Sequence, residues 1–307
     1  MNFREFADQR HQNLLACGVN LYAPPFVFRI RSPHSFVWEA IASSYADFAV
    51  LDDHAYVDFE LTIAPVTGIR RWINPLVDMS IDGLFPFDPL PAAQAYPLLE
   101  WGMNWCVTST AHHFLMCHSA VLAWNNLAVI LPAPPGSGKS TLCAALTMSG
   151  WRLLSDELAL LDPETLLLSP FVRPVSLKNA SINLIGKRYP AAEFTVPVRD
   201  TIKGEVAHMR PTVESVRQST SLAKPRWLIF PKYVKDVELE LQPMQKSEAV
   251  AELAKNAFNF RGFGAKGFAT LSALVESVDC YRLNYSSLDQ AIEKFNRLGV
   301  EASKAAI

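Results

Sequence analysis

The first 90 residues alternate short apolar runs with turn signals. Residues 26–31 and 56–63 show period-two alternation of apolar and polar side chains, which predicts two half-buried β-strands. Residues 35–45 predict a short helix between them, and residues 75–82 predict a third strand that ends in an Asp-Gly turn at 82–83. This region carries no chemical motif, and we expect a small α+β packing or assembly region.

A proline-rich stretch at residues 85–91 separates this region from the rest of the chain. We therefore expect a small α+β N-terminal region at 1–90 and an α/β domain at 91–307. After a predicted helix at 92–110, short buried strands alternate with helices, which is the order of an α/β domain. Strands are predicted at 113–124, 127–131, 151–155, 227–230 and 237–242, and helices at 139–149, 248–258, 267–278 and 288–298.

Charge and cysteine content exclude several classes of protein. The 307 residues include 28 Lys and Arg against 30 Asp and Glu, whereas a nucleic-acid binder normally presents a basic face or tail, so nucleic acid is not an expected partner. The five cysteines are scattered without a C-x-x-C pair, which argues against a disulfide framework or a structural zinc site. No apolar run approaches the roughly 20 residues that span a bilayer. We expect a cytoplasmic protein without a membrane partner.

The strongest motif is Ala-Pro-Pro-Gly-Ser-Gly-Lys-Ser at 133–140, a P-loop motif with alanine in place of its first glycine. Such a loop wraps backbone N–H groups around a phosphate and points a helix N-terminus at it. Pro134 and Pro135 have no N–H, but they lie in the first half of the loop, and the donating amides come from the second half. Lys139 is expected to reach the β- and γ-phosphates, and the Ser140 hydroxyl is expected to bind Mg²⁺. The residues expected to contact ATP are Ala133, Gly136, Ser137, Gly138, Lys139, Ser140 and Thr141.

Asp156 and Glu157 form an acidic pair about seventeen residues after Lys139, at the end of the strand predicted at 151–155. If that strand neighbours the P-loop strand in a parallel sheet, its carboxyl end opens into the same crevice. A carboxylate there binds Mg²⁺ or accepts a proton from an attacking hydroxyl. His118 lies in a predicted strand beside the P-loop strand, either as a core histidine or as a partner of the acidic pair.

These residues resemble the kinase domain of bacterial HPr kinase/phosphorylase over residues 113–180, through His118-Ser-Ala-Val-Leu, the P-loop motif and Arg152-Leu-Leu-Ser-Asp-Glu. Over most of its length the chain is more similar to the HPr kinase-related kinase A family, through residues 173–179, 203–204, 230–233 and 258–260. The resemblance implies an ATP- and Mg²⁺-dependent kinase with the P-loop fold shared by HPr kinase and phosphoenolpyruvate carboxykinase. It also implies that Asp156 takes the proton from the acceptor hydroxyl, that Glu157 lies near Mg²⁺, and that His118 supports the pair.

The chain departs from the HPr kinase pattern at the expected metal site. The acidic pair is Asp-Glu rather than Asp-Asp, and Ser176 stands where HPr kinases have a metal-binding glutamate. Lys178 keeps a positive charge nearby, and both Lys178 and Lys203 are candidate contacts to the phosphate or the acceptor. Arg173 is a further candidate clamp. Residues 259–267 fit either a lid or docking loop or a helix–helix connection.

The expected function is transfer of the ATP γ-phosphate to a hydroxyl, as a serine kinase that acts on a protein or peptide. The acceptor is unidentified, although the related family is associated with bacterial exosortase-type surface-polymer systems, which suggests a dedicated partner protein. HPr kinases assemble as oligomers, so a homo-oligomer is plausible. Two alternatives stay open: a small-molecule kinase that acts on free serine, and a non-catalytic nucleotide-sensing regulatory protein.

Overall fold

The computed structural model describes residues 1–7, 18–68 and 74–305 and divides the chain into two compact units. The first unit comprises Met1–Ala111, Ser176–Gly186 and Ala191–Arg210, and the second comprises His112–Val175, Lys187–Pro190 and Pro211–Ile307. The division expected after residue 90 differs from this boundary because helix α3 (Ala95–Thr110) packs on strands of the first unit. A Cβ on Gly102 of α3 would overlap the Met79 side chain, so the helix and the sheet are in close contact there.

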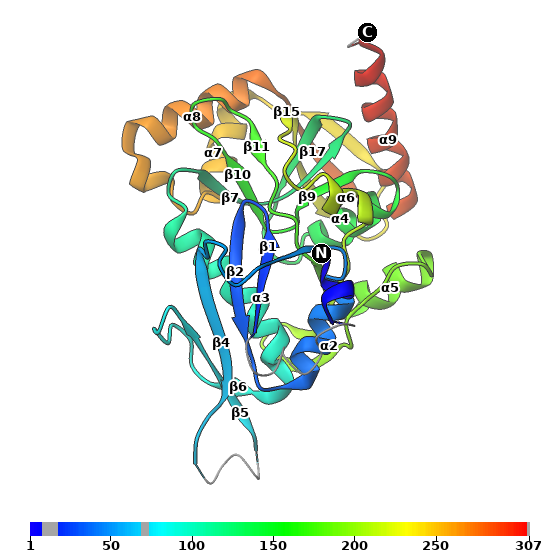
Figure 1. Ribbon diagram of the computed structural model, residues 1–307. Helices are drawn as coiled ribbons and strands as arrows, with labels where there is room; N and C mark the ends of the chain where they lie inside the picture. Colours follow the sequence, from blue (N-terminus) through cyan, green and yellow to red (C-terminus); the bar gives the residue numbers. More distant parts are fainter. Residues whose placement is uncertain (8–17, 69–73, 306–307) are drawn as a thin grey trace. The chain divides into compact units, whose positions relative to one another are not determined.

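The first unit is built on a sheet with the strand order β3-β1-β2-β4-β5-β6 (Figure 1). The strands are β1 (Val19–Ala23), β2 (Phe26–Arg31), β3 (Ala49–Leu51), β4 (Phe59–Pro65), β5 (Leu76–Ile81) and β6 (Leu90–Pro91), and helix α2 (Ser35–Ser44) follows β2. The strands predicted at 26–31 and 75–82 and the helix predicted at 35–45 are confirmed, whereas the strand predicted at 56–63 begins at Phe59. Asp82 and Gly83 have φ angles of 50° and 82° and form the expected tight turn.

A second, three-stranded sheet comes from the middle of the chain. It contains β12 (Val175–Lys178), β13 (Val198–Thr201) and β14 (Gly204–Met209) in the order β12-β14-β13, with α5 (Ala180–Arg188) after β12. Gln94 Nε2 donates a 2.8 Å hydrogen bond to the Asp200 carbonyl. Arg210 forms ion pairs with Asp47 and Glu193. These contacts join the middle segment to the N-terminal part of the first unit.

The second unit is built on a mixed sheet with the order β11-β10-β7-β8-β15-β17-β16. The strands are β7 (Leu115–Trp124), β8 (Leu127–Pro132), β9 (Arg152–Ser155), β10 (Leu158–Leu161), β11 (Leu168–Ser169), β15 (Lys224–Tyr233), β16 (Glu240–Pro243) and β17 (Asp279–Tyr285). Strands β8, β15 and β17 are parallel, and β7 is antiparallel to β8. The carboxyl ends of three parallel strands therefore open at one edge of this sheet.

Helices cover both faces of this sheet. They are α4 (Lys139–Met148), α6 (Val213–Arg217), α7 (Lys246–Lys255), α8 (Gly264–Ser277) and α9 (Leu288–Ala305). On one face, α7 and α8 bury Leu253, Leu271 and Leu274 in a core with β7, β8 and β15 (Figure 1). On the other face, the Trp151 ring packs against Trp227 and Phe295 of α9. The predicted α/β class is confirmed by this arrangement.

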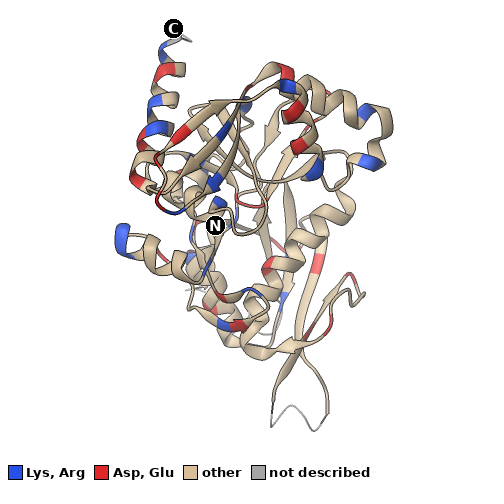
Figure 2. Cartoon of the chain, turned by 180° about the vertical axis from the view of Figure 1, so that it is seen from behind, with Lys and Arg blue, Asp and Glu red and all other residues tan. Residues whose placement is uncertain are grey.

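Lys and Arg are interspersed with Asp and Glu over the elements, as along α9 (Figure 2). In the part of the chain that the structure describes, no helix combines the length and the apolar character needed to cross a membrane.

Candidate nucleotide site in the second unit

The P-loop motif forms the turn between β8 and α4, as the motif predicted. Gly136 and Gly138 have φ angles of 85° and 86°, a left-handed conformation that favours glycine. Gly138 caps α4, and its carbonyl accepts the amide hydrogen of Leu142 at 2.9 Å. The amides of the second half of the loop therefore lie at the N-terminus of a ten-residue helix, where the helix dipole favours an anion.

Two tyrosines from the ends of neighbouring strands brace this loop. The Tyr233 amide of β15 donates a 2.8 Å hydrogen bond to the Ser137 carbonyl. The Tyr285 hydroxyl of β17 donates a 3.3 Å hydrogen bond to the Gly138 carbonyl, and Tyr285 is 2% exposed. These two hydrogen bonds point the Ser137 and Gly138 carbonyls toward the strands. The N–H group of each of these peptide units lies on the opposite side from its carbonyl, so it points away from the strands. The sequence did not identify this role for either tyrosine.

Lys139 is 7% exposed, and its ammonium lies 3.1 Å from His118 Nε2. An ammonium has only donors, so His118 Nε2 accepts the hydrogen and its imidazole is neutral in this arrangement. His118 belongs to β7, which pairs with β8 as predicted. The two candidate residues are thus brought together beside the P-loop motif.

Asp156 lies in the short connection between β9 and β10 and is 5% exposed. β9 does not neighbour the P-loop strand, because β7 lies between β9 and β8. Both strands are antiparallel to β7, so their carboxyl ends still point toward the same edge. Ser119 of β7 pairs with Pro132, where β8 ends, and its amide donates to the Glu157 carbonyl at 3.1 Å. The acidic pair and the start of the P-loop motif are therefore on either side of the same β7 residue.

Cys143 connects the acidic pair to the P-loop helix. It lies one helical turn after Lys139 and is fully buried. Burial raises the pKa of the Cys143 thiol well above its ordinary value, the nearby Asp156 carboxylate raises it further, and Lys139 acts in the opposite direction. The thiol donates a hydrogen bond to Asp156. Asp156, Cys143 and Lys139 thus belong to one buried polar cluster.

The turn that carries Glu157 is fixed by Ser155. The Ser155 hydroxyl accepts the amide hydrogens of Glu157 and Leu158 at 3.3 and 3.0 Å. Glu157 and Ser140 are each only partly buried. No group of three or more His, Cys, Asp or Glu side chains within residues 1–7, 18–68 and 74–305 is suited to hold a metal.

Two buried hydroxyls have no hydrogen-bond partner among the described residues. The Ser137 hydroxyl belongs to the P-loop motif, and the Ser119 hydroxyl belongs to the β7 residue opposite Pro132. A buried hydroxyl without a partner is energetically costly, by roughly 1–3 kcal/mol. The Ser137 hydroxyl lies in the loop itself, where a bound group with acceptor oxygens would give it a partner. A phosphate has the required acceptor oxygens.

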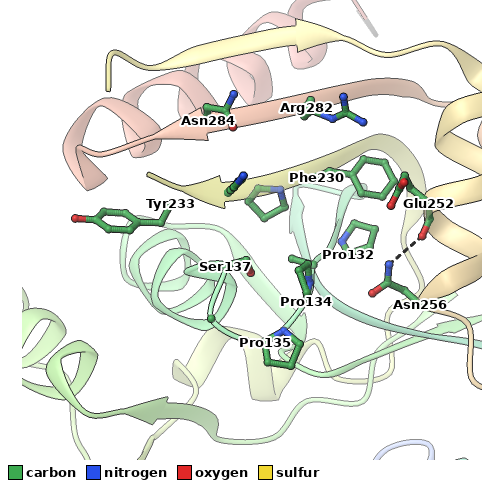
Figure 3. A pocket seen from close by; sticks show the side chains of 14 residues that line it. Pro132, Pro134, Pro135, Ser137, Phe230, Tyr233, Glu252, Asn256, Arg282 and Asn284 are labelled. Carbon is green, nitrogen blue, oxygen red and sulfur yellow. Dashed lines mark hydrogen bonds between the residues drawn. The ribbon is translucent and has the colours of Figure 1, made fainter. Parts of the chain in front are cut away.

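A pocket of about 400 Å³ opens on the first half of the P-loop motif. Its wall continues along the carboxyl ends of β15 and β17 to the last turn of α7. The side chains that define its chemistry are Phe230, Tyr233, Glu252, Asn256, Arg282 and Asn284. Figure 3 shows Phe230, Glu252 and Asn256 gathered at one end of the pocket and Tyr233 at the other. Apart from residues 230–233, which carried the family resemblance, no sequence signal pointed to this group, because its members are far apart in the chain.

Three basic candidates remain, Lys178, Lys203 and Arg173. Lys178 and Lys203 belong to the first unit, where the Lys203 ammonium lies 5.1 Å from the centre of the Trp101 ring, and their expected contacts with phosphate or acceptor stay predictions. The Arg173 guanidinium lies 4.9 Å from the centre of the Phe171 ring. Residues 259–267 form a 3-10 turn and the start of α8, so they are a helix–helix connection between α7 and α8.

Comparison with known proteins leaves the family of the chain undetermined. No protein-family model matches it, and no curated protein matches it significantly.

Proposed function

We propose that this chain is an ATP- and Mg²⁺-dependent kinase that transfers the γ-phosphoryl group to a hydroxyl, most simply a serine of a protein or peptide. The observation that carries the proposal is the convergence of the P-loop motif, Lys139 and Asp156 at one edge of the second unit's sheet. The resemblance to HPr kinase-related kinases and to the fold of HPr kinase and phosphoenolpyruvate carboxykinase agrees with it.

In the proposed reaction, the P-loop amides and Lys139 bind the β- and γ-phosphates. To do so, the Lys139 ammonium exchanges the imidazole of His118 for a phosphate oxygen. The acceptor hydroxyl oxygen attacks the γ-phosphorus, the bond to the β–γ bridging oxygen breaks, and ADP leaves. The acceptor proton passes to the Asp156 carboxylate, which acts as the general base.

The residues at the site suit magnesium bound through the nucleotide. Mg²⁺ prefers oxygen ligands and is commonly held by one or two protein groups together with phosphates. Ser140, the second residue of α4, and Glu157 are both partly buried and supply such oxygens. When bound there, Mg²⁺ neutralises the charge that develops on the phosphate oxygens.

The test is incubation of the purified chain with γ-labelled ATP, Mg²⁺ and cell extract, followed by mass spectrometry of the labelled product. Lys139→Ala should lose both ATP binding and transfer. Asp156→Asn should keep ATP binding and lose transfer by roughly 10²–10⁴-fold. Asp162→Asn is the matched control, because Asp162 follows β10 as Asp156 follows β9, and it should retain transfer.

The outcomes separate the competing functions. Label in a protein or peptide supports the proposal, and label in free serine or another small molecule supports a small-molecule kinase. Tight ATP binding without a labelled product from any extract supports a nucleotide-sensing protein. Normal transfer by Asp156→Asn would remove Asp156 as the base.

A further inference from the structure

The helix that begins in the P-loop motif also reaches the acidic pair. Helix α4 packs on β7 and on β9, and Asp156 directly follows β9. Lys139, Cys143 and Thr147 follow one another at intervals of four residues, so they share one face of α4. All three are buried, and Cys143 is completely inaccessible to solvent. Cys143 therefore lies inside the protein, one helical turn beyond the phosphate-binding end of α4.

The Cys143 side chain acts as a hydrogen-bond donor. Its thiol donates to the Asp156 carboxylate. Burial raises the pKa of the thiol well above its ordinary value, so the thiol keeps its proton at neutral pH and is not a nucleophile. A carboxylate has two oxygens with several lone pairs, so it can accept the thiol hydrogen and still accept a second proton. The contact thus restrains the carboxylate without blocking its use as a base.

The Asp156 carboxylate needs such a restraint because it follows the end of a strand. The Ser155 hydroxyl fixes the backbone of this turn through the amides of Glu157 and Leu158. Those hydrogen bonds hold the main chain, whereas the rotamer of the Asp156 side chain depends on contacts of its own. A general base must lie within hydrogen-bond reach of the attacking hydroxyl, and a displacement of about 1 Å can lower the rate on the order of 10²-fold.

The position of Cys143 on α4 couples the base to the phosphate site. Lys139 begins α4 and Cys143 follows it by one turn, and a helix is rigid over that length. A contact between Cys143 and Asp156 therefore sets the place of the carboxylate relative to the helix end at which the triphosphate is proposed to bind. An aliphatic side chain at position 143 would fill the space but would have no hydrogen to donate.

We infer that Cys143 is a positioning residue for the proposed phosphoryl transfer, in which its thiol holds the Asp156 carboxylate in place relative to the phosphate-binding end of α4. Because Asp156 is the base only in the proposed function, this role rests on that function. Cys143 itself touches neither the nucleotide nor the acceptor.

The test replaces the thiol with groups that keep or remove the donor. Cys143→Ala and Cys143→Val both lack it and differ in volume, so a loss that they share does not come from a cavity. Each should lower kcat by roughly five- to fiftyfold and leave the KM for ATP unchanged. Cys143→Ser keeps a donor and should recover most of kcat. The rates are measured with γ-labelled ATP, Mg²⁺ and a fixed amount of cell extract as the source of acceptor.

A double-mutant cycle separates positioning from packing. In the Asp156→Asn background, Cys143→Ala should cause little further loss of transfer, because the carboxylate that it positions is already gone. The matched control is Cys280→Ala, since Cys280 is another buried cysteine of the second unit whose thiol donates to the Val275 and Val278 carbonyls. It should leave kcat and KM unchanged. Urea unfolding shows that each variant is folded.

Folded Cys143→Ala or Cys143→Val with an unchanged kcat would overturn the inference and leave the kinase proposal intact. The same follows if Cys143→Ser is as slow as Cys143→Ala, or if Cys143→Ala causes the same fold loss in the Asp156→Asn background. An unchanged chain that labels no acceptor would refute the proposed function, and the role of Cys143 with it.

Discussion

Replacing Gly138 by alanine tests whether the two strand-end tyrosines hold the P-loop in its shape. Gly138 has a φ of 86°, and a Cβ at this position would lie 2.7 Å from Tyr285 Oη and 3.0 Å from Tyr233 Cβ. Tyr285 is 2% exposed, so its ring has little room to move away. The substitution therefore combines an unfavourable backbone conformation with steric overlap.

Gly136→Ala separates these two effects. Gly136 has nearly the same φ, 85°, but a Cβ there would meet no atom within 4 Å. The left-handed conformation alone costs roughly 1–2 kcal/mol for a residue with a Cβ. Overpacking adds roughly 1–3 kcal/mol, so Gly138→Ala should lose about 2–5 kcal/mol in the free energy of unfolding.

The assay is urea unfolding followed by circular dichroism, together with ATP titration of each folded variant. Gly138→Ala should lose more unfolding free energy and more ATP affinity than Gly136→Ala. Adding Tyr285→Phe to Gly138→Ala should recover part of the loss, because it removes the oxygen at 2.7 Å and leaves the ring carbon at 3.6 Å. Equal losses for the two glycine variants, or no recovery in the double variant, would refute the bracing role of Tyr285.

Three further predictions concern other parts of the chain. Ser155→Ala should cost about 1–2 kcal/mol in unfolding free energy, because the Ser155 hydroxyl accepts the Leu158 amide hydrogen in the turn that carries the acidic pair. It should reduce the rate of phosphate transfer more than the affinity for ATP, as measured by transfer assays and ATP titration. Burial raises the pKa of the Cys117 thiol from the ordinary 9.0 to about 12, so little reactive thiolate forms at pH 9.5 in the folded chain. Mass spectrometry should therefore show slow alkylation of Cys117 at pH 9.5 in the native chain and fast alkylation in urea. Arg210→Ala should lose about 1–3 kcal/mol in the free energy of unfolding in urea, because the partly buried Asp47 carboxylate would lose its cation. A change below 1 kcal/mol for the last variant would contradict the pairing.

Short-range patterns predicted the local structure around the P-loop motif well. The motif lies between a buried strand and a helix because its glycines allow the left-handed turns that this connection needs. β7 pairs with β8, as expected, through a tight turn at Asn125, which has a φ of 53°. The strand predicted at 151–155 is present, and Gly150, with a φ of 99°, ends the preceding helix as expected.

Long-range pairing was beyond these patterns. The sequence left open whether β9 lies next to the P-loop strand, because two strands separated by one helix can pair directly or leave a place for a third. Here β7 takes that place. The middle segment at 175–210 joins the first unit through contacts with residues more than a hundred positions earlier, such as Gln94 with Asp200, and local periodicity carries no information about such contacts.

The sequence alone determined the left-handed turns and the helix start at residues 133–140, because backbone conformation there depends on neighbouring residues. Only the tertiary structure decided which distant side chains surround that loop. It placed His118 against Lys139, Cys143 against Asp156, and the ends of β15 and β17 beside the loop. These contacts depend on the order of the strands within the sheet. That order is set by the packing of whole apolar faces and not by the spacing of residues in one segment.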